Sequence, residues 1–123
     1  MASAEADLRA RPPVAFTVER VRLDETGGRC LIAGADDEAE PAGYFIVDLD
    51  DLGPTLEFLD ETLIQRDGVL ELEIGSHHLA FTFDPASPIG GQMPTVRVTA
   101  NEAIDAAVRA RLGVAFAGRV RES

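Results

Sequence analysis

The sequence predicts a single α+β domain: a curved, mostly antiparallel sheet of about six or seven strands with two helices packed on one face. Three observations support this prediction. The chain has 123 residues and a hydrophobic content of 46%, which suits one domain with one core. Short β-rich runs are joined by turns that are too short for parallel crossovers. Two longer segments carry apolar residues at helical spacing.

Residues 1–13 are expected to be a flexible N-terminal arm, because Pro12 and Pro13 stop any helix there. The single domain is then expected to cover residues 14–123. The sequence contains no repeat and no interior linker that would divide this range.

The first part of the domain is predicted to be strands. In residues 14–23, Val14, Phe16 and Val18 alternate onto one face, and a later change of phase indicates a bulge near Glu19. Residues 29–34 should then form a strand, residues 35–43 an acidic loop, and residues 44–49 another strand.

Two helices are predicted. The first runs from Pro54 to Arg66, since proline suits the first helical position and four leucines recur at helical spacing. The second covers 99–112, because Thr99 and Glu102 have the spacing of a capping box and Gly113 follows as a stop. The leucines of the first helix are Leu52, Leu56, Leu59 and Leu63. Arg109 and Arg111 should complement the carboxyl end of the second helix.

Residues 69–83 are predicted to form a hairpin around a two-residue turn at Gly75 and Ser76. This register pairs Glu73 with His78. Neighbouring strand residues point to opposite faces, so His77 and His78 should not chelate one metal ion, and we expect both to be structural. The register also places six apolar residues on one face: Leu70, Leu72, Ile74, Leu79, Phe81 and Phe83. Further strands are expected at 95–99 and 114–120.

No catalytic constellation, metal site or cofactor site is predicted, so the protein is not expected to be an enzyme. Asp48 and Asp50 have the spacing of a calcium loop, but Leu52 and Leu59 stand where that loop needs further ligands. Cys30 lies in an apolar run and should be a buried thiol. The loop 84–94 is the best candidate for a binding lip.

The charge of the chain is strongly asymmetric. Its formal net charge is −11, from 22 acidic residues and 11 arginines. Residues 24–61 hold 12 of the acids and only Arg29. Nucleic-acid binding is therefore not expected, because phosphate contact needs a positive surface. No apolar run is long enough for a membrane span, and the N-terminal residues do not have the pattern of a signal peptide, so we expect a cytoplasmic protein.

These features leave three classes of function open. The first is a protein-interaction module, such as an immunity-type inhibitor or a chaperone-like binder, that holds a basic protein partner. The expected order of elements is similar to that of secretion chaperones, by topology alone. The second class is a self-associating subunit, possible as a homodimer, and the third is a small-ligand binder with a pocket between sheet and helices. The expected partner-binding residues are Asp36, Asp37, Glu38, Glu40, Asp48, Asp50 and Asp51.

Overall fold

The computed structural model describes residues 14–37, 39 and 42–123, and the predicted arm 1–13 lies outside these residues. The elements, in chain order, are β1 (Val14–Val18), β2 (Arg22–Thr26), β3 (Arg29–Ala35), β4 (Tyr44–Asp50), β5 (Gly53–Phe58), β6 (Ile64–Arg66), β7 (Val69–Ile74), β8 (His78–Phe83), α2 (Pro88–Gln92), β9 (Thr95–Ala100), α3 (Ala106–Ala115) and β10 (Val120–Glu122).

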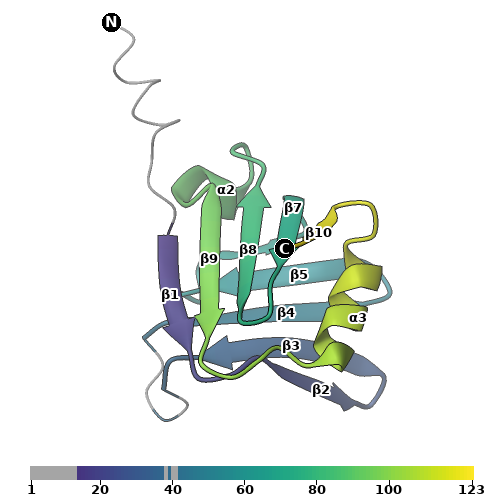
Figure 1. The fold of residues 1–123 in the computed structure, drawn as a ribbon. Coiled ribbons are helices and arrows are strands. Elements are labelled where there is room, and N and C mark those ends of the chain that lie inside the picture. The colour runs from purple at the N-terminus through teal and green to yellow at the C-terminus, as the bar shows by residue number, and fades with distance from the viewer. Residues whose placement is uncertain (1–13, 38, 40–41) are drawn as a thin grey trace, which may run out of the picture.

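The strands form two five-stranded sheets that face each other (Figure 1). Sheet A has the order β1-β9-β8-β7-β10, and sheet B has the order β2-β3-β4-β5-β6. Sheet B is antiparallel throughout, whereas β1 with β9 and β10 with β7 are parallel pairs in sheet A. The domain is therefore α+β and mostly β, as predicted in outline, but the expected single sheet of about six or seven strands is replaced by two sheets.

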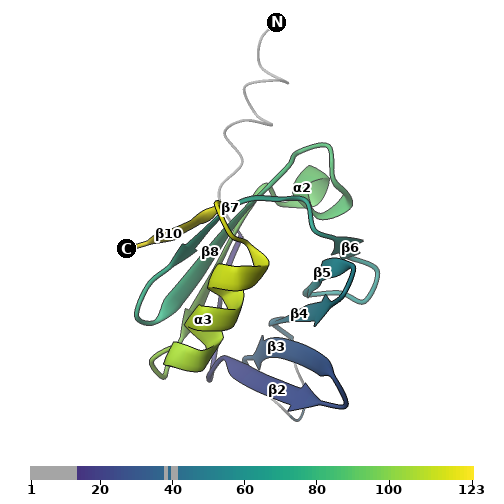
Figure 2. The ribbon, with the colours of Figure 1, turned by 90° about the vertical axis from the view of Figure 1, so that its right-hand side faces the viewer.

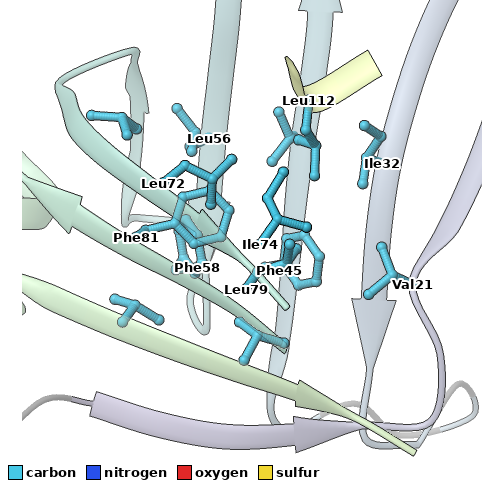
Figure 3. Packing of buried hydrophobic residues seen from close by; sticks show 14 of the residues in the cluster. Val21, Ile32, Phe45, Leu56, Phe58, Leu72, Ile74, Leu79, Phe81 and Leu112 are labelled. Carbon is cyan, nitrogen blue, oxygen red and sulfur yellow. The ribbon is translucent and has the colours of Figure 1, made fainter. Parts of the chain in front are cut away.

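The core lies between the two sheets because alternate residues of each strand point into that space. Phe45 and Phe58 come from sheet B, and Phe81 and Phe83 come from sheet A. The ring of Phe58 lies 5.2 Å from that of Phe81 and 5.5 Å from that of Phe83, both edge to face. Figure 3 shows Phe45, Phe58 and Phe81 meeting at the centre.

The two helices do not share one face of a sheet, so that part of the prediction is wrong. α3 covers the open side between the two sheets, and it buries Val108 and Leu112 in the core (Figure 2). α2 is a short helix in the predicted loop 84–94. The buried Gln65 holds α2 in place, since its side-chain oxygen accepts a hydrogen bond of 2.6 Å from Ile89 N.

The predicted helix from Pro54 to Arg66 is wrong: the chain forms β5 and β6 there. Pro54, Leu56 and Phe58 alternate into the core, a strand period that the leucine spacing concealed. Leu52 is 77% exposed, and Leu59 has a positive φ of 66°, so no leucine stripe forms. Without this helix, the order of elements similar to secretion chaperones is not present.

The predicted capping box at Thr99 is also wrong. Thr99 lies inside β9, paired with Thr17 of β1 and His78 of β8. Strand pairing on both sides outweighs the local helix signal. The helix begins at Ala106, and its N-cap, Asp105, makes no side-chain capping bond. Since α3 runs to Ala115, the predicted stop at Gly113 and the predicted helix-end positions of Arg109 and Arg111 are wrong: all three residues lie within the helix.

The hairpin of β7 and β8 forms, but its register differs from the prediction by two residues. Leu72 pairs with Phe81, and Gly75 N donates a 2.9 Å hydrogen bond to His78 O across a longer loop. A two-residue shift keeps every side chain on its face, so five of the six predicted core residues are buried. Leu70 is the exception, 55% exposed, because a bulge between Val69 and Glu71 turns Val69 inward instead.

The two histidines diverge as expected. His77 is exposed and bonds to Ser76 Oγ at 3.1 Å, while His78 Nε2 lies 2.8 Å from Glu73 Oε2. The predicted contact of His78 with Glu73 is thus confirmed, although it is diagonal and not directly across the strands.

Two of the other predicted strands have different bounds in the structure, and three are confirmed. The chain expected as one bulged strand over 14–23 leaves sheet A after Val18 and enters sheet B at Arg22. The predicted last strand over 114–120 reduces to β10, after the end of α3. The predicted strands 29–34, 44–49 and 95–99 are confirmed as β3, β4 and β9.

Candidate functional site

The acidic segment of the sequence forms most of one sheet. Residues 24–61 run from within β2 through β5 and their loops, and all of these strands belong to sheet B. The rest of the chain holds 10 acidic and 10 basic residues. The net negative charge is therefore concentrated on one layer of the domain.

The side chains of sheet B that alternate away from the core form one surface, which we call the outer face. Among the described residues, no helix or strand covers it (Figure 2). Its members follow from the strand register: Arg22, Asp24, Thr26, Arg29, Leu31, Ala33, Ala35, Tyr44, Ile46, Asp48, Asp50, Thr55, Glu57, Ile64 and Arg66.

The centre of the outer face is apolar. Ile46 lies between Ala33 on β3 and Glu57 on β5, and Leu31 is the next outward residue on β3. Ile64 on β6 is 49% exposed. A shallow hollow of about 410 Å³ runs over Ala33, Tyr44 and Ile46. An uncovered apolar strip of this kind with a charged rim is typical of protein interaction surfaces.

Tyr44 is held in one orientation beside this strip. Its hydroxyl donates a 2.5 Å hydrogen bond to Glu57 Oε2. Burial raises the pKa of Tyr44, as do the donated hydrogen bond and the nearby carboxylates of Glu57, Asp60 and Glu61. The phenol therefore stays protonated and offers a fixed, amphipathic contact, a property common among residues that dominate interfaces.

At the end of sheet B that carries the β2–β3 and β4–β5 turns, the acids are paired with arginines, and we call this the compensated end. Asp48 pairs with Arg29, and Asp50 Oδ1 lies 3.3 Å from Arg66 Nη1. The hydrogen bond from Leu52 N, together with Arg66, lowers the pKa of Asp50. Near this end, Glu25 on the edge strand β2 pairs with Arg111 of α3 at 2.5 Å.

The opposite end of sheet B carries the β3–β4 loop and the β5–β6 turn, and we call it the acidic end. It gathers five carboxylates: Asp36, Asp37, Glu57, Asp60 and Glu61. No ion pair joins any of these five to an arginine among the residues that the structure describes. Some of them have local roles, because Asp60 accepts a 2.8 Å bond from Thr62 N, which lowers the pKa of Asp60.

The seven predicted partner-binding residues therefore do not form one cluster. Asp36 and Asp37 are exposed at the acidic end, while Asp51 is exposed in the turn at the compensated end. Asp48 and Asp50 lie on the outer face at the compensated end, each paired with an arginine. Glu38 and Glu40 lie outside the described residues.

Sequence reasoning missed the apolar part of the surface. In the β4 sequence YFIVDLD, Phe45 and Val47 point inward, so Tyr44, Ile46 and Asp48 must point outward. The outward positions of Tyr44 and Ile46 were the signal of a partly apolar strip on this face. The expectation of a helix from Pro54 to Arg66 hid the same alternation in β5.

Other chemistry receives little support within the described range. No group of three His, Cys, Asp or Glu side chains gathers there as a metal ion would require. Cys30 is buried as predicted, and burial raises the pKa of its thiol. None of the described helices has the length and hydropathy needed to cross a membrane. No protein family, curated protein or solved structure matches the chain.

Proposed function

We propose that this protein is a small cytoplasmic interaction module that binds a basic protein partner on the outer face of sheet B, as an immunity-type inhibitor or a chaperone-like binder would. The observation that carries the proposal is an uncovered, partly apolar sheet face on the same sheet that holds most of the charge excess. Each part of this surface has a distinct physical role.

The apolar strip around Ile46 would supply affinity. Docking a partner there removes Leu31, Ile46 and Ile64 from water, at roughly 25 cal/mol per Å² of apolar area buried. Asp48 Oδ1 adds a specific feature, because it is buried and has no hydrogen-bond partner among the described residues. A donor from the partner reaches this atom only if docking displaces the side chains that cover it.

The carboxylates of the acidic end would raise the association rate and favour basic partners over others. Uncompensated carboxylates attract a basic surface before contact, which raises the association rate at low ionic strength. The attraction weakens as salt rises, since the Debye length is about 10 Å at 0.1 M. Nucleic acid carries the wrong sign of charge for this surface.

A self-associating subunit is the second candidate, because an uncovered apolar face also fits a second copy. The two candidates respond to salt in opposite directions. Two copies that each carry −11 repel, so added salt would strengthen a homodimer, whereas it would slow the capture of a basic partner.

The test is affinity capture from a lysate of the source organism, followed by measurement of the association rate of the captured partner. Ile46→Asp removes the apolar centre and should abolish capture, whereas Thr99→Asp on the exposed side of sheet A is its matched control and should not. Glu61→Lys should slow association about threefold or more at low salt, and Glu102→Lys, an equal change of charge beside α3, should not.

Two results would contradict the proposal. Capture that survives Ile46→Asp would place the partner elsewhere on the protein. If the association rate does not respond to salt or to Glu61→Lys, the acidic end is only a solvated surface and has no role in binding.

A further inference from the structure

A second, separate hollow lies between α3 and the compensated end of sheet B. This groove has a volume of about 530 Å³, within the roughly 300–1,000 Å³ of ordinary binding sites. Leu49 and Pro54 form its sheet wall, and Ala110, Val114 and Ala115 form its helix wall. Figure 1 shows α3 beside the ends of β3, β4 and β5 where these walls meet.

Exposed apolar side chains stand on both sides of the groove. Val114 on the helix wall is 78% exposed, and Leu52, in the turn between the lining residues Asp51 and Gly53, is 77% exposed. α3 does not need Val114 for its own packing, because Val108 and Leu112 already anchor the helix to the core. Apolar groups on both sides of an apolar hollow indicate a surface that another molecule covers.

The charges around the groove leave one carboxylate without a counter-ion. Arg111 is bound to Glu25 at 2.5 Å, and Asp50 is paired with Arg66 at 3.3 Å. Asp51 is exposed, and no ion pair involving it is found in the part of the chain that the structure describes. A ligand with a positive group next to its apolar part would therefore complement the groove.

The groove walls also restrict the backbone of such a ligand. They consist of strand ends, turns and a helix, and none of these presents a free row of backbone N–H and C=O groups for strand addition. A polypeptide that enters must satisfy its own backbone, as an α-helix does. A second copy of this chain is disfavoured, since both copies would carry −11.

We propose that this groove binds an amphipathic α-helix of a partner protein, with aliphatic anchors on one face and a lysine or arginine beside them that pairs with Asp51. The site is distinct from the outer face. It opens beside α3, and Asp50 is the one lining residue that it shares with the outer face.

The test uses three synthetic peptides of about 14 residues, long enough to form a helix on a surface. The first has leucines at helical spacing and lysines elsewhere, the second has the same composition without an apolar face, and the third replaces lysine by glutamate. The first peptide should bind at least about tenfold more tightly than either of the others in fluorescence anisotropy.

Variants then locate the binding. Val114→Glu should weaken the first peptide about tenfold, and Asp51→Lys about threefold. The matched controls are Ala107→Glu on the exposed side of the same helix and Glu102→Lys, and both should change binding less than about twofold. If circular dichroism shows that Val114→Glu disturbs the fold, Leu52→Glu in the exposed turn tests the same side of the groove.

Three outcomes would overturn the inference. Equal binding of the first two peptides would show attraction by charge alone. Loss of binding in Ile46→Asp but not in Val114→Glu would move the peptide to the outer face, leaving the proposed function intact while this inference fails. A dimer of the free protein that Val114→Glu dissociates would assign the groove to a second copy.

Discussion

The ion pair between Asp67 and Arg119 joins the end of α3, which forms the helix wall of the groove, to the rest of the fold, and its contribution to stability can be measured. Arg119 follows α3 and donates two hydrogen bonds to the Asp67 carboxylate, at 2.7 and 3.2 Å, and a third of 2.7 Å to Val69 O. Its guanidinium also lies over the ring of Phe116 at 5.2 Å. These contacts join the end of α3 to the turn between β6 and β7.

Asp67→Asn is the cleanest perturbation of this bridge. Asp67 has a positive φ of 53°, and asparagine tolerates that conformation better than most residues, so the backbone gains little strain. The substitution removes the charge but keeps an acceptor for Val69 N. A charge-assisted pair contributes about 1.5–3 kcal/mol when well shielded, and both side chains here are about a third exposed, so we expect a loss of about 1–2 kcal/mol at pH 7.

The pH dependence of this loss has a definite sign. Burial by itself would raise the pKa of Asp67, but the hydrogen bonds from Arg119 and Val69 N outweigh it and hold the pKa below its ordinary value of 3.8. A carboxylate with a lowered folded pKa stabilises the protein above its unfolded pKa and loses that effect as pH falls through the folded one. The difference between wild type and Asp67→Asn should therefore shrink as the pH drops below 3.8.

Urea unfolding followed by circular dichroism, at pH 7 and at several values below pH 4, measures this difference directly. Asp105→Asn is a suitable control, since Asp105 is exposed and makes no side-chain capping bond. A difference that stays the same at every pH would show that the charge of Asp67 contributes nothing, and the reasoning from the ion pair would then be wrong.

Two further predictions concern the hairpin of β7 and β8. Leu72→Ala should lower the free energy of unfolding by about 2–5 kcal/mol in the same urea assay, because Leu72 is fully buried. Leu70→Ala, at a site 55% exposed, should lower it by less than about 1 kcal/mol. Equal losses would refute the bulge at Val69. His77→Ala together with His78→Ala should leave metal content unchanged in elemental analysis of the purified protein. Stoichiometric zinc that this double variant loses would contradict the structural role of both histidines.

The sequence predicted those parts of the fold that depend on alternation within a strand. Val14, Phe16 and Val18 share a face as expected, and so do the buried residues of β7 and β8. The hairpin shows why this signal is robust: the turn was assigned wrongly, yet a register error of two residues left each side chain on its predicted face.

The errors arose where local and tertiary preferences conflict. Leucines at spacings of three and four fit a helix, but residues 53–58 pair with β4 and place Leu56 opposite Val47. Likewise, Thr99 has the side chain of a helix cap, but it has strand partners on both sides. Pairing between strands depends on residues distant in the sequence, which local patterns do not contain.

The candidate site shows what a count of charges can and cannot give. The acidic stretch 24–61 does form most of sheet B, but its role as a binding surface stays a prediction. The count could not show that Arg66 reaches Asp50 or that Arg111 reaches Glu25, since the second of these pairs spans 86 positions in the sequence. Nor could it show which face of the sheet would remain uncovered.

These distant arginines change where the protein's negative field is centred. A carboxylate paired with a guanidinium contributes only a weak dipolar field a few ångströms away, whereas an unpaired carboxylate contributes its full charge. Among the described residues, Asp37 and Glu61 have no ion-pair partner and contribute their full charge, whereas Asp50 contributes little, although all three lie in the same acidic stretch of sequence. A basic partner would approach over the acidic end first and then settle across the apolar strip toward the compensated end. Asp48 lies on that path next to Leu31, and its carboxylate stays paired with Arg29.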